Sequence, residues 1–245
     1  MEVTERREEV QSLPRPRVAG VFYLLTFVCG GIAAFSDRLV VHGDAAATAA
    51  NILAQQSLFW SGFAAYLMVV ACYVVVTALF YELFRPVSKN LSLLAAFFSL
   101  VGCAVQATIC VFLSAALALF QGASYFSAFT HQQQQAFGYL SLQLFGQGFD
   151  ICFVFFGFYC LLIGYLVFRS TFLPRVIGVL MVLAGLGWLT FCVPALAHSL
   201  DPYIRIPGVV GEASLTLWLL AAGVNLERWK KLAGGERSRT TSAPV

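Results

Sequence analysis

The sequence predicts an all-α membrane protein, a polytopic bundle of six transmembrane helices with both termini in the cytoplasm. Of its 245 residues, 60% are hydrophobic and 11% are charged, against about 25% charged residues in soluble domains. No charged residue occurs between Asp44 and Glu82. Only Asp150 interrupts the stretch between Lys89 and Arg169. Crossing a bilayer takes about 20 apolar residues, so these gaps accommodate spans and leave no room for a separate soluble domain.

Six apolar segments are predicted to span the membrane, at residues 18–36, 58–83, 91–120, 136–169, 176–197 and 208–226. The fourth is longer than a bilayer requires and is expected to begin outside it, near Ala136. After the first span, Asp44 precedes an alanine-rich run, which is typical of an N-cap that opens a short surface helix. The predicted organisation is therefore a cytoplasmic tail (1–17), one membrane domain (18–226) and a disordered basic cytoplasmic tail (227–245).

The orientation follows from the basic residues. Four arginines precede the first span, two basic residues lie in each of two short turns and five follow the last span, so 13 of 15 are on one side. Only Arg38 and Arg205 lie on the other side. The positive-inside rule assigns the richer side to the cytoplasm. Because the basic residues flank spans, the net charge of +3 implies no nucleic-acid partner.

The fourth segment carries a polar face near its outer end. Gln143, Gln147 and Asp150 are spaced so that they share one side of a helix. Small residues continue the same stripe toward the inner end, at Gly157, Cys160 and Gly164. This face is expected to meet protein or water, because a carboxylate in contact with lipid costs several kcal/mol.

Polar residues in other spans lie at a similar predicted depth. Counting from the cytoplasmic anchors at about 1.5 Å per residue places Tyr66, Gln106 and Glu212 in the outer half of the bilayer with Asp150. One interpretation is an outward-facing ligand pocket. The other is a set of interhelical hydrogen bonds that hold the bundle together. The candidate ligand-binding residues are Tyr66, Gln106, Gln143, Gln147, Asp150 and Glu212.

Neither a metal site nor a cofactor is predicted. The seven cysteines all lie in apolar runs and form no CxxC pair, so they are interpreted as small packing residues. His42, His131 and His198 fall in predicted outer loops without the spacing of a zinc motif.

Three function classes remain open. The chain can bind or transport a small molecule or lipid, it can be a membrane enzyme acting on a lipid or isoprenoid substrate, or it can be a partner subunit of a membrane complex. Only the first two require Asp150 and Glu212, as titrating groups or as acid and base.

Three segments, HGDAAATAANILA, FFGFYCLLIGYLVFRSTFLPRVIGVLMVLAGLGWL and GEASLTLWLL, give the chain a resemblance to a known family. It resembles bacterial polytopic membrane proteins defined as a domain of unknown function, over about Arg17 to Leu226. The resemblance implies a helical fold in the bacterial cytoplasmic membrane and no activity. Tyr159 stands where relatives commonly carry histidine, which argues against histidine chemistry at that position.

Overall fold

The computed structural model of the chain describes residues 14–241, apart from the side chains of residues 198 and 235–241. Over this range the chain is helical and contains no strand. Five helices are long and apolar enough to cross a membrane, or six when α9 is taken together with the first part of α10. The predicted all-α membrane bundle is therefore confirmed. The long helices are α2 (Pro16–Ser36), α4 (Gln56–Phe84), α5 (Lys89–Phe120), α6 (His131–Arg169), α7 (Arg175–Leu189) and α9 (Arg205–Ala221).

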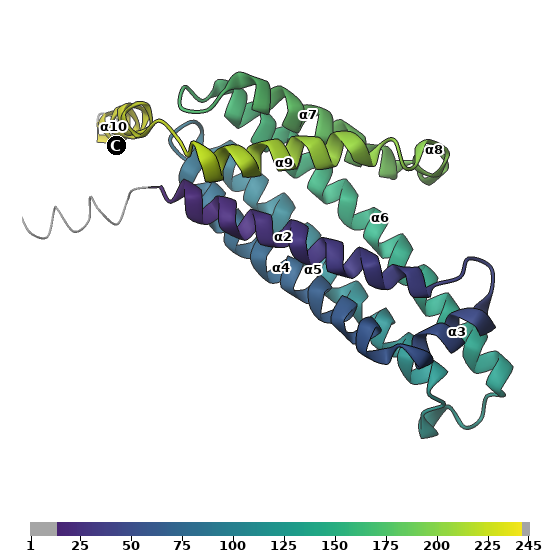
Figure 1. Cartoon of the computed structure of the whole chain (residues 1–245). Helices are drawn as coiled ribbons and strands as arrows, with labels where there is room; N and C mark the ends of the chain where they lie inside the picture. The colour runs from purple at the N-terminus through teal and green to yellow at the C-terminus, as the bar shows by residue number, and fades with distance from the viewer. Residues whose placement is uncertain (1–13, 242–245) are drawn as a thin grey trace, which may run out of the picture.

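These six helices form a ring in chain order, because each packs on the next and α9 packs on α2. Shorter helices complete the fold: α3 (Ala45–Ala54), α8 (Pro194–Leu200) and α10 (Leu226–Thr241), with 3-10 turns at Asp37–Leu39, Ser124–Phe126 and Thr190–Cys192. Figure 1 shows α7 and α9 diverging from α2, α4 and α5 toward the end of the molecule that carries α3 and α8. The ring is thus closed at the end with the chain termini and splayed at the other.

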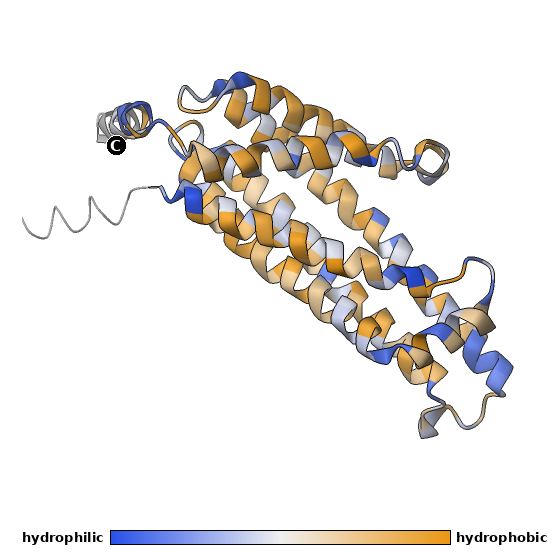
Figure 2. Ribbon diagram, viewed as in Figure 1, coloured by the Kyte–Doolittle hydropathy of each residue, from blue (hydrophilic) through white to orange (hydrophobic). Residues whose placement is uncertain are grey.

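The outer surface of the ring is apolar. Figure 2 shows hydrophobic residues along the length of the long helices and hydrophilic residues concentrated near their ends. Large apolar side chains such as Val111 and Leu217 are 58% and 61% exposed. Exposed apolar surface on this scale is disfavoured in water and stable in lipid, so the outer faces are the lipid-contacting surface.

Capping residues fix where several helices begin. The Asp44 side chain accepts a hydrogen bond from the backbone N–H of Ala47 at 2.8 Å, which confirms the predicted start of the short helix after the first span. Thr130 and Gln133 form a reciprocal capping box at the start of α6. Such caps satisfy backbone donors that have no partner within the helix. They allow α6 to begin in the polar segment that precedes its apolar portion.

Close backbone contact between α6 and α7 depends on glycine. A Cβ added at Gly178 would lie 2.7 Å from the Gly164 carbonyl oxygen, and one added at Gly185 would lie 2.7 Å from the Gly157 carbonyl oxygen. The two glycines on each helix are seven residues apart, so both pairs lie along one seam. Small residues that let helix backbones approach are a common device of membrane bundles. Gly157 and Gly164 of the small-residue stripe predicted on the fourth segment belong to this contact surface.

The last two spans end earlier than predicted. Helix α7 stops at Leu189 and passes into a 3-10 turn, before Pro194 opens α8. Helix α9 stops at Ala221. Two residues later Gly223 adopts φ +67° and donates its N–H to the Trp218 carbonyl. Glycine in this left-handed conformation is a frequent helix terminator, and the chain then bends by 101° into α10.

The expectation of a disordered tail after Leu226 is wrong for the first part of α10. Trp229 is 5% exposed and its Nε1–H donates to the Leu83 carbonyl oxygen at 2.9 Å. Leu83 belongs to the last turn of α4, whose carbonyls lack partners within the helix, so the indole caps α4. Residues 242–245 of the predicted tail and residues 1–13 of the N-terminal tail lie outside the described range.

Replacing Trp229 with phenylalanine should lower stability by about 1 kcal/mol, because the ring stays apolar while the cap on Leu83 is lost. Thermal unfolding of the purified protein in detergent measures the change. Trp218→Phe is the matched control, since that side chain is 39% exposed. Equal effects at the two tryptophans would contradict the capping role.

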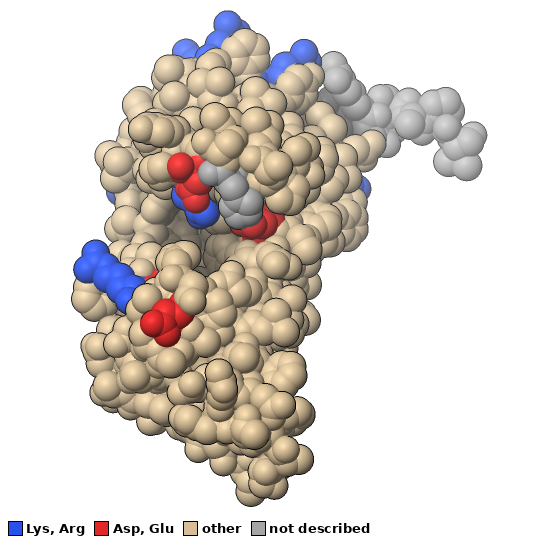
Figure 3. Space-filling view, turned by 90° about the vertical axis from the view of Figure 1, so that its right-hand side faces the viewer, with Lys and Arg blue, Asp and Glu red and all other residues tan. Residues whose placement is uncertain are grey.

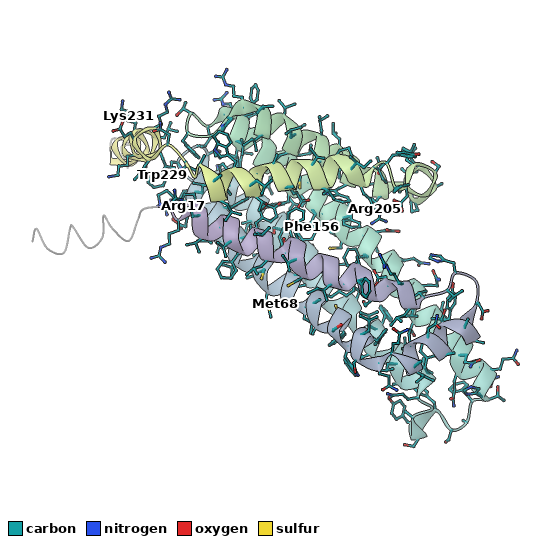
Figure 4. All side chains as sticks on the ribbon, in the orientation of Figure 1. Arg17, Met68, Phe156, Arg205, Trp229 and Lys231 are labelled. Carbon is teal, nitrogen blue, oxygen red and sulfur yellow. The ribbon has the colours of Figure 1, made fainter. Side chains whose placement is uncertain are left out.

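Two of the basic residues predicted to lie on the inner side share one end of the molecule. Figure 4 labels Arg17 and Lys231 at the end with the termini and Arg205 at the opposite end. The assignment of the first end to the cytoplasm stays a prediction. Reporter fusions after Lys89 should read as internal and fusions after Ala128 as external, and the reverse pattern would contradict the orientation.

Candidate functional site

A cavity of about 880 Å³ lies inside the helix ring, between all six long helices. Figure 3, viewed from the splayed end, shows a hollow whose rim carries both acidic and basic side chains. Aromatic and aliphatic side chains form much of the lining: Phe27, Phe59, Phe63, Val69, Leu113, Leu142, Phe145, Phe149, Phe153, Phe156 and Val209. The cavity is therefore largely apolar, with polar groups at a few places.

All six sequence-predicted site residues line this one cavity: Tyr66, Gln106, Gln143, Gln147, Asp150 and Glu212. They differ in burial. Gln106 and Glu212 are 2% and 8% exposed, whereas Gln143 and Gln147 are exposed and Asp150 is half-buried. The structure thus brings together side chains from four helices, and those of Tyr66, Gln106 and Glu212 are buried. Their role in binding a ligand stays a prediction.

The Glu212 carboxyl group is surrounded by hydrogen-bond donors. One oxygen accepts from the hydroxyls of Tyr23 at 2.8 Å and Tyr73 at 2.5 Å. The other accepts from Nε1 of Trp188 at 3.0 Å and lies 3.8 Å from the Cys160 sulfur. A buried acid with this many donors is well satisfied in a low-dielectric interior.

This arrangement connects five helices. Tyr23 belongs to α2, Tyr73 to α4, Cys160 to α6 and Trp188 to α7, and all converge on Glu212 of α9. Since both carboxyl oxygens are engaged by protein groups, the geometry matches the interhelical interpretation for Glu212.

Gln106 differs from Glu212 in having an unpaired polar atom. Its Oε1 lies 4.0 Å from the Cys152 sulfur, and its Nε2 is buried without a hydrogen-bond partner. Among the described residues only one other side chain has such a buried atom, the hydroxyl of Tyr159, which does not line the cavity. Gln106 therefore keeps a buried donor that no protein group satisfies.

Two acids that line the cavity, Asp37 and Asp201, have side-chain partners. The Tyr66 hydroxyl donates to Asp37 at 2.8 Å, so this predicted site residue is already engaged by a carboxylate. Arg205 donates to Asp201 through two nitrogens, at 2.8 and 3.1 Å. The same guanidinium lies 5.5 Å from the centre of the Phe153 ring, within the range of a cation–π contact.

Sequence reasoning missed part of the site. Tyr23, Tyr73 and Trp188 were not singled out, although all three bind Glu212. Tyr73 lies seven residues after Tyr66, hence on the same face of α4, and this repeat was a usable signal. Tyr23 and Trp188 offered none, because an isolated aromatic residue in a span usually packs against other helices or lies at the interface.

The family model that matches the chain covers residues 18–223 and is described as a domain of unknown function, DUF4386. The chain belongs to the DUF4386 family. This confirms the resemblance found in the sequence, and the matched range includes every residue that lines the cavity.

A relative of this DUF4386 protein is an uncharacterized protein from the archaeon Archaeoglobus fulgidus. It is 26% identical over 171 residues, which are 70% of this chain and 82% of the relative. No solved structure matches the chain. Since the relative is archaeal, the expected bacterial origin and cytoplasmic membrane stay predictions.

Proposed function

We propose that this DUF4386 protein binds a small hydrophobic or amphipathic molecule, such as a lipid, in the central cavity and serves as a binding or transport protein of the cell membrane. The observation that carries the proposal is the cavity itself, about 880 Å³ in volume. Ligand sites typically measure about 300–1,000 Å³ and combine apolar walls with a few polar groups. The aromatic lining and the buried Gln106 fit that description.

Binding is favoured over catalysis because of Glu212. An enzyme with Asp150 and Glu212 as acid and base would need both carboxyl groups available to substrate. Glu212 instead accepts from Tyr23, Tyr73 and Trp188. These contacts support a structural role for Glu212.

The test is to fill the cavity from a position that has room. Gly31 of α2 lines the cavity, and a Cβ added there would meet nothing within 4 Å. We expect Gly31→Trp to fold and to lose any molecule that co-purifies with the wild type from native membranes, as measured by mass spectrometry. Ile32→Trp is the matched control, because Ile32 follows Gly31 in the sequence, is 45% exposed and lies outside the cavity lining.

Two results would contradict the proposal. One is an identical set of co-purifying molecules in the wild type and in Gly31→Trp, which would place binding on the outer surface. The other is loss of the molecules in both variants, since Ile32→Trp leaves the cavity unfilled.

A further inference from the structure

The first and last long helices of the ring, α2 and α9, touch near the chain termini and separate toward the splayed end. On the terminal side, a Cβ added at Gly20 would lie 2.9 Å from Cγ of Leu220. Further along, Tyr23 of α2 donates to Glu212 of α9 at 2.8 Å. Figure 1 shows the two helices diverging beyond this region. The contact between α2 and α9 thus closes the wall of the ring on the terminal side.

Toward the splayed end, exposed residues of both helices line the cavity. They are Gly31 and Ala34 on α2 and Val209 on α9, and Val209 is 50% exposed. A Cβ added at Gly31 would meet nothing within 4 Å, so no neighbouring helix packs against this position. A cavity whose lining is exposed on two adjacent helices is open between them. We call this gap, flanked by Gly31, Ala34 and Val209, the lateral opening.

The lateral opening lies at a depth that lipid chains occupy. Gly31 is in the second half of the apolar span Pro16–Leu39. Beside the opening, Ile32 and Val210 are 45% and 47% exposed, and neither lines the cavity. They belong to the apolar outer surface of the ring, which is stable in lipid and disfavoured in water. The medium outside the opening is therefore hydrocarbon.

The cavity is long enough to hold a lipid chain along its length. Its lining follows α4 from Phe59 to Tyr73 and α6 from Leu142 to Phe156. Each of these stretches covers about 21 Å at about 1.5 Å per residue. One leaflet contributes roughly 15 Å to a hydrocarbon layer of about 30 Å. A chain from that leaflet fits within the cavity.

Charged groups lie about one turn beyond the lateral opening on both flanks. Asp37 follows Ala34 by three residues and Arg205 precedes Val209 by four, and both line the cavity. Asp201 accepts from Arg205 at 2.8 Å. Apolar walls that end in charged groups match the two parts of a lipid, the chain and the headgroup.

We propose that the occupant of the cavity is an acyl chain of a bilayer lipid, which enters sideways through the lateral opening while the headgroup stays near Asp37 and Arg205. This inference rests on the proposed binding function and adds the class of the ligand and its route. A chain that moves sideways passes from hydrocarbon to an apolar lining without exposing its surface to water, so the transfer carries no hydrophobic cost.

The fluorescence of Trp188 tests the inference. Trp188 lines the cavity and is 6% exposed. The full chain has four tryptophans, and replacing the other three with phenylalanine leaves Trp188 as the single reporter. This protein is reconstituted into vesicles of phosphatidylcholine whose acyl chains carry bromine, a short-range quencher of tryptophan fluorescence. We expect Trp188 to be quenched, because brominated chains enter the cavity.

A second version of the protein reports contact with lipid from outside the ring. It keeps only Trp218, which is 39% exposed. Its fluorescence should be quenched by the brominated lipid whether or not the lateral opening is blocked, so it verifies that each variant remains folded in the bilayer.

Substitutions at the lateral opening locate the route. Gly31→Phe and Val209→Phe narrow the opening from its two sides, so each should abolish the quenching of Trp188. Ile32→Phe and Val210→Phe are the matched controls, because these sequence neighbours lie outside the cavity lining. Both controls should keep the quenching of the parent protein.

The outcomes separate this inference from the proposed function. If Trp188 is not quenched while Gly31→Trp still loses its co-purifying molecules, the acyl-chain inference is overturned and the binding function stands. Quenching of Trp188 that persists in both Gly31→Phe and Val209→Phe would also overturn the inference, since the chains would then reach Trp188 by another route. An unquenched Trp188, together with unchanged co-purifying molecules in Gly31→Trp, would count against both.

Discussion

Replacing Gly178 with alanine should separate α6 from α7 and lower the stability of the bundle by at least about 2 kcal/mol. The added Cβ would lie 2.7 Å from the carbonyl oxygen of Gly164 and 2.7 Å from the backbone nitrogen of Phe168. Both are backbone atoms, so no side-chain rotation relieves the contact. Overpacking that forces backbone to move commonly costs about 1–3 kcal/mol or more, and here it acts on a seam shared by two spans.

Thermal unfolding in detergent measures the loss. Gly146→Ala is the matched control on the partner helix α6, because a Cβ at Gly146 would meet nothing within 4 Å. Alanine is the better helix former by about 0.5–1 kcal/mol, so this control should be neutral or stabilising. If Gly178→Ala were as stable as Gly146→Ala, the glycine seam would not be what holds α6 and α7 together.

Replacing Glu212 with leucine is expected to destabilise the bundle by several kcal/mol. The change removes the acceptor of three buried donors, on Tyr23, Tyr73 and Trp188. Each buried donor left without a partner costs about 1–3 kcal/mol. Glu212→Gln should be intermediate, because its carbonyl oxygen can still accept from one side while its amide N–H groups meet the donors on the other.

A double-mutant cycle distinguishes lost hydrogen bonds from poor packing. Tyr73→Phe should cost less in the Glu212→Leu background than in the wild type, since the hydroxyl it removes has already lost its acceptor. Glu82→Gln is the control, because that side chain is 52% exposed and makes a surface ion pair with Arg85 at 3.4 Å. Such pairs contribute about 0–1 kcal/mol. Additive effects of Tyr73→Phe and Glu212→Leu would contradict the hydrogen-bond interpretation.

Much of this fold could be predicted because the bilayer imposes a simple rule on sequence. Long apolar runs between charged turns such as Arg85 to Lys89 place the spans, and polar residues within them must turn away from lipid. That rule also placed Gln106, Asp150 and Glu212 on the inside of the bundle, where all three line one cavity. Helical spacing alone was enough to group Gln143 and Gln147 with Asp150.

What composition cannot give is which polar group pairs with which. Glu212 and Gln106 looked equivalent in the sequence, as single polar residues at similar depth. In the structure one is saturated by donors from α2, α4 and α7, and the other keeps an unpaired nitrogen. The difference depends on the rotation and tilt of neighbouring helices, which contacts between side chains determine. Trp229 was misjudged for the same reason, since its partner Leu83 lies 146 positions away.

The spans of this ring are unequal in length, and the membrane has to accommodate them. Helix α9 has 17 residues and α5 has 32, which at about 1.5 Å per residue correspond to roughly 25 Å and 48 Å. The hydrocarbon layer of a bilayer is about 30 Å thick. Beside a span that is shorter than this layer, such as α9, the bilayer is expected to thin, whereas a longer span such as α5 tilts or extends beyond the hydrocarbon. The lipid around this protein is therefore expected to differ in thickness from one side of the ring to the other, and to be thinner beside α9.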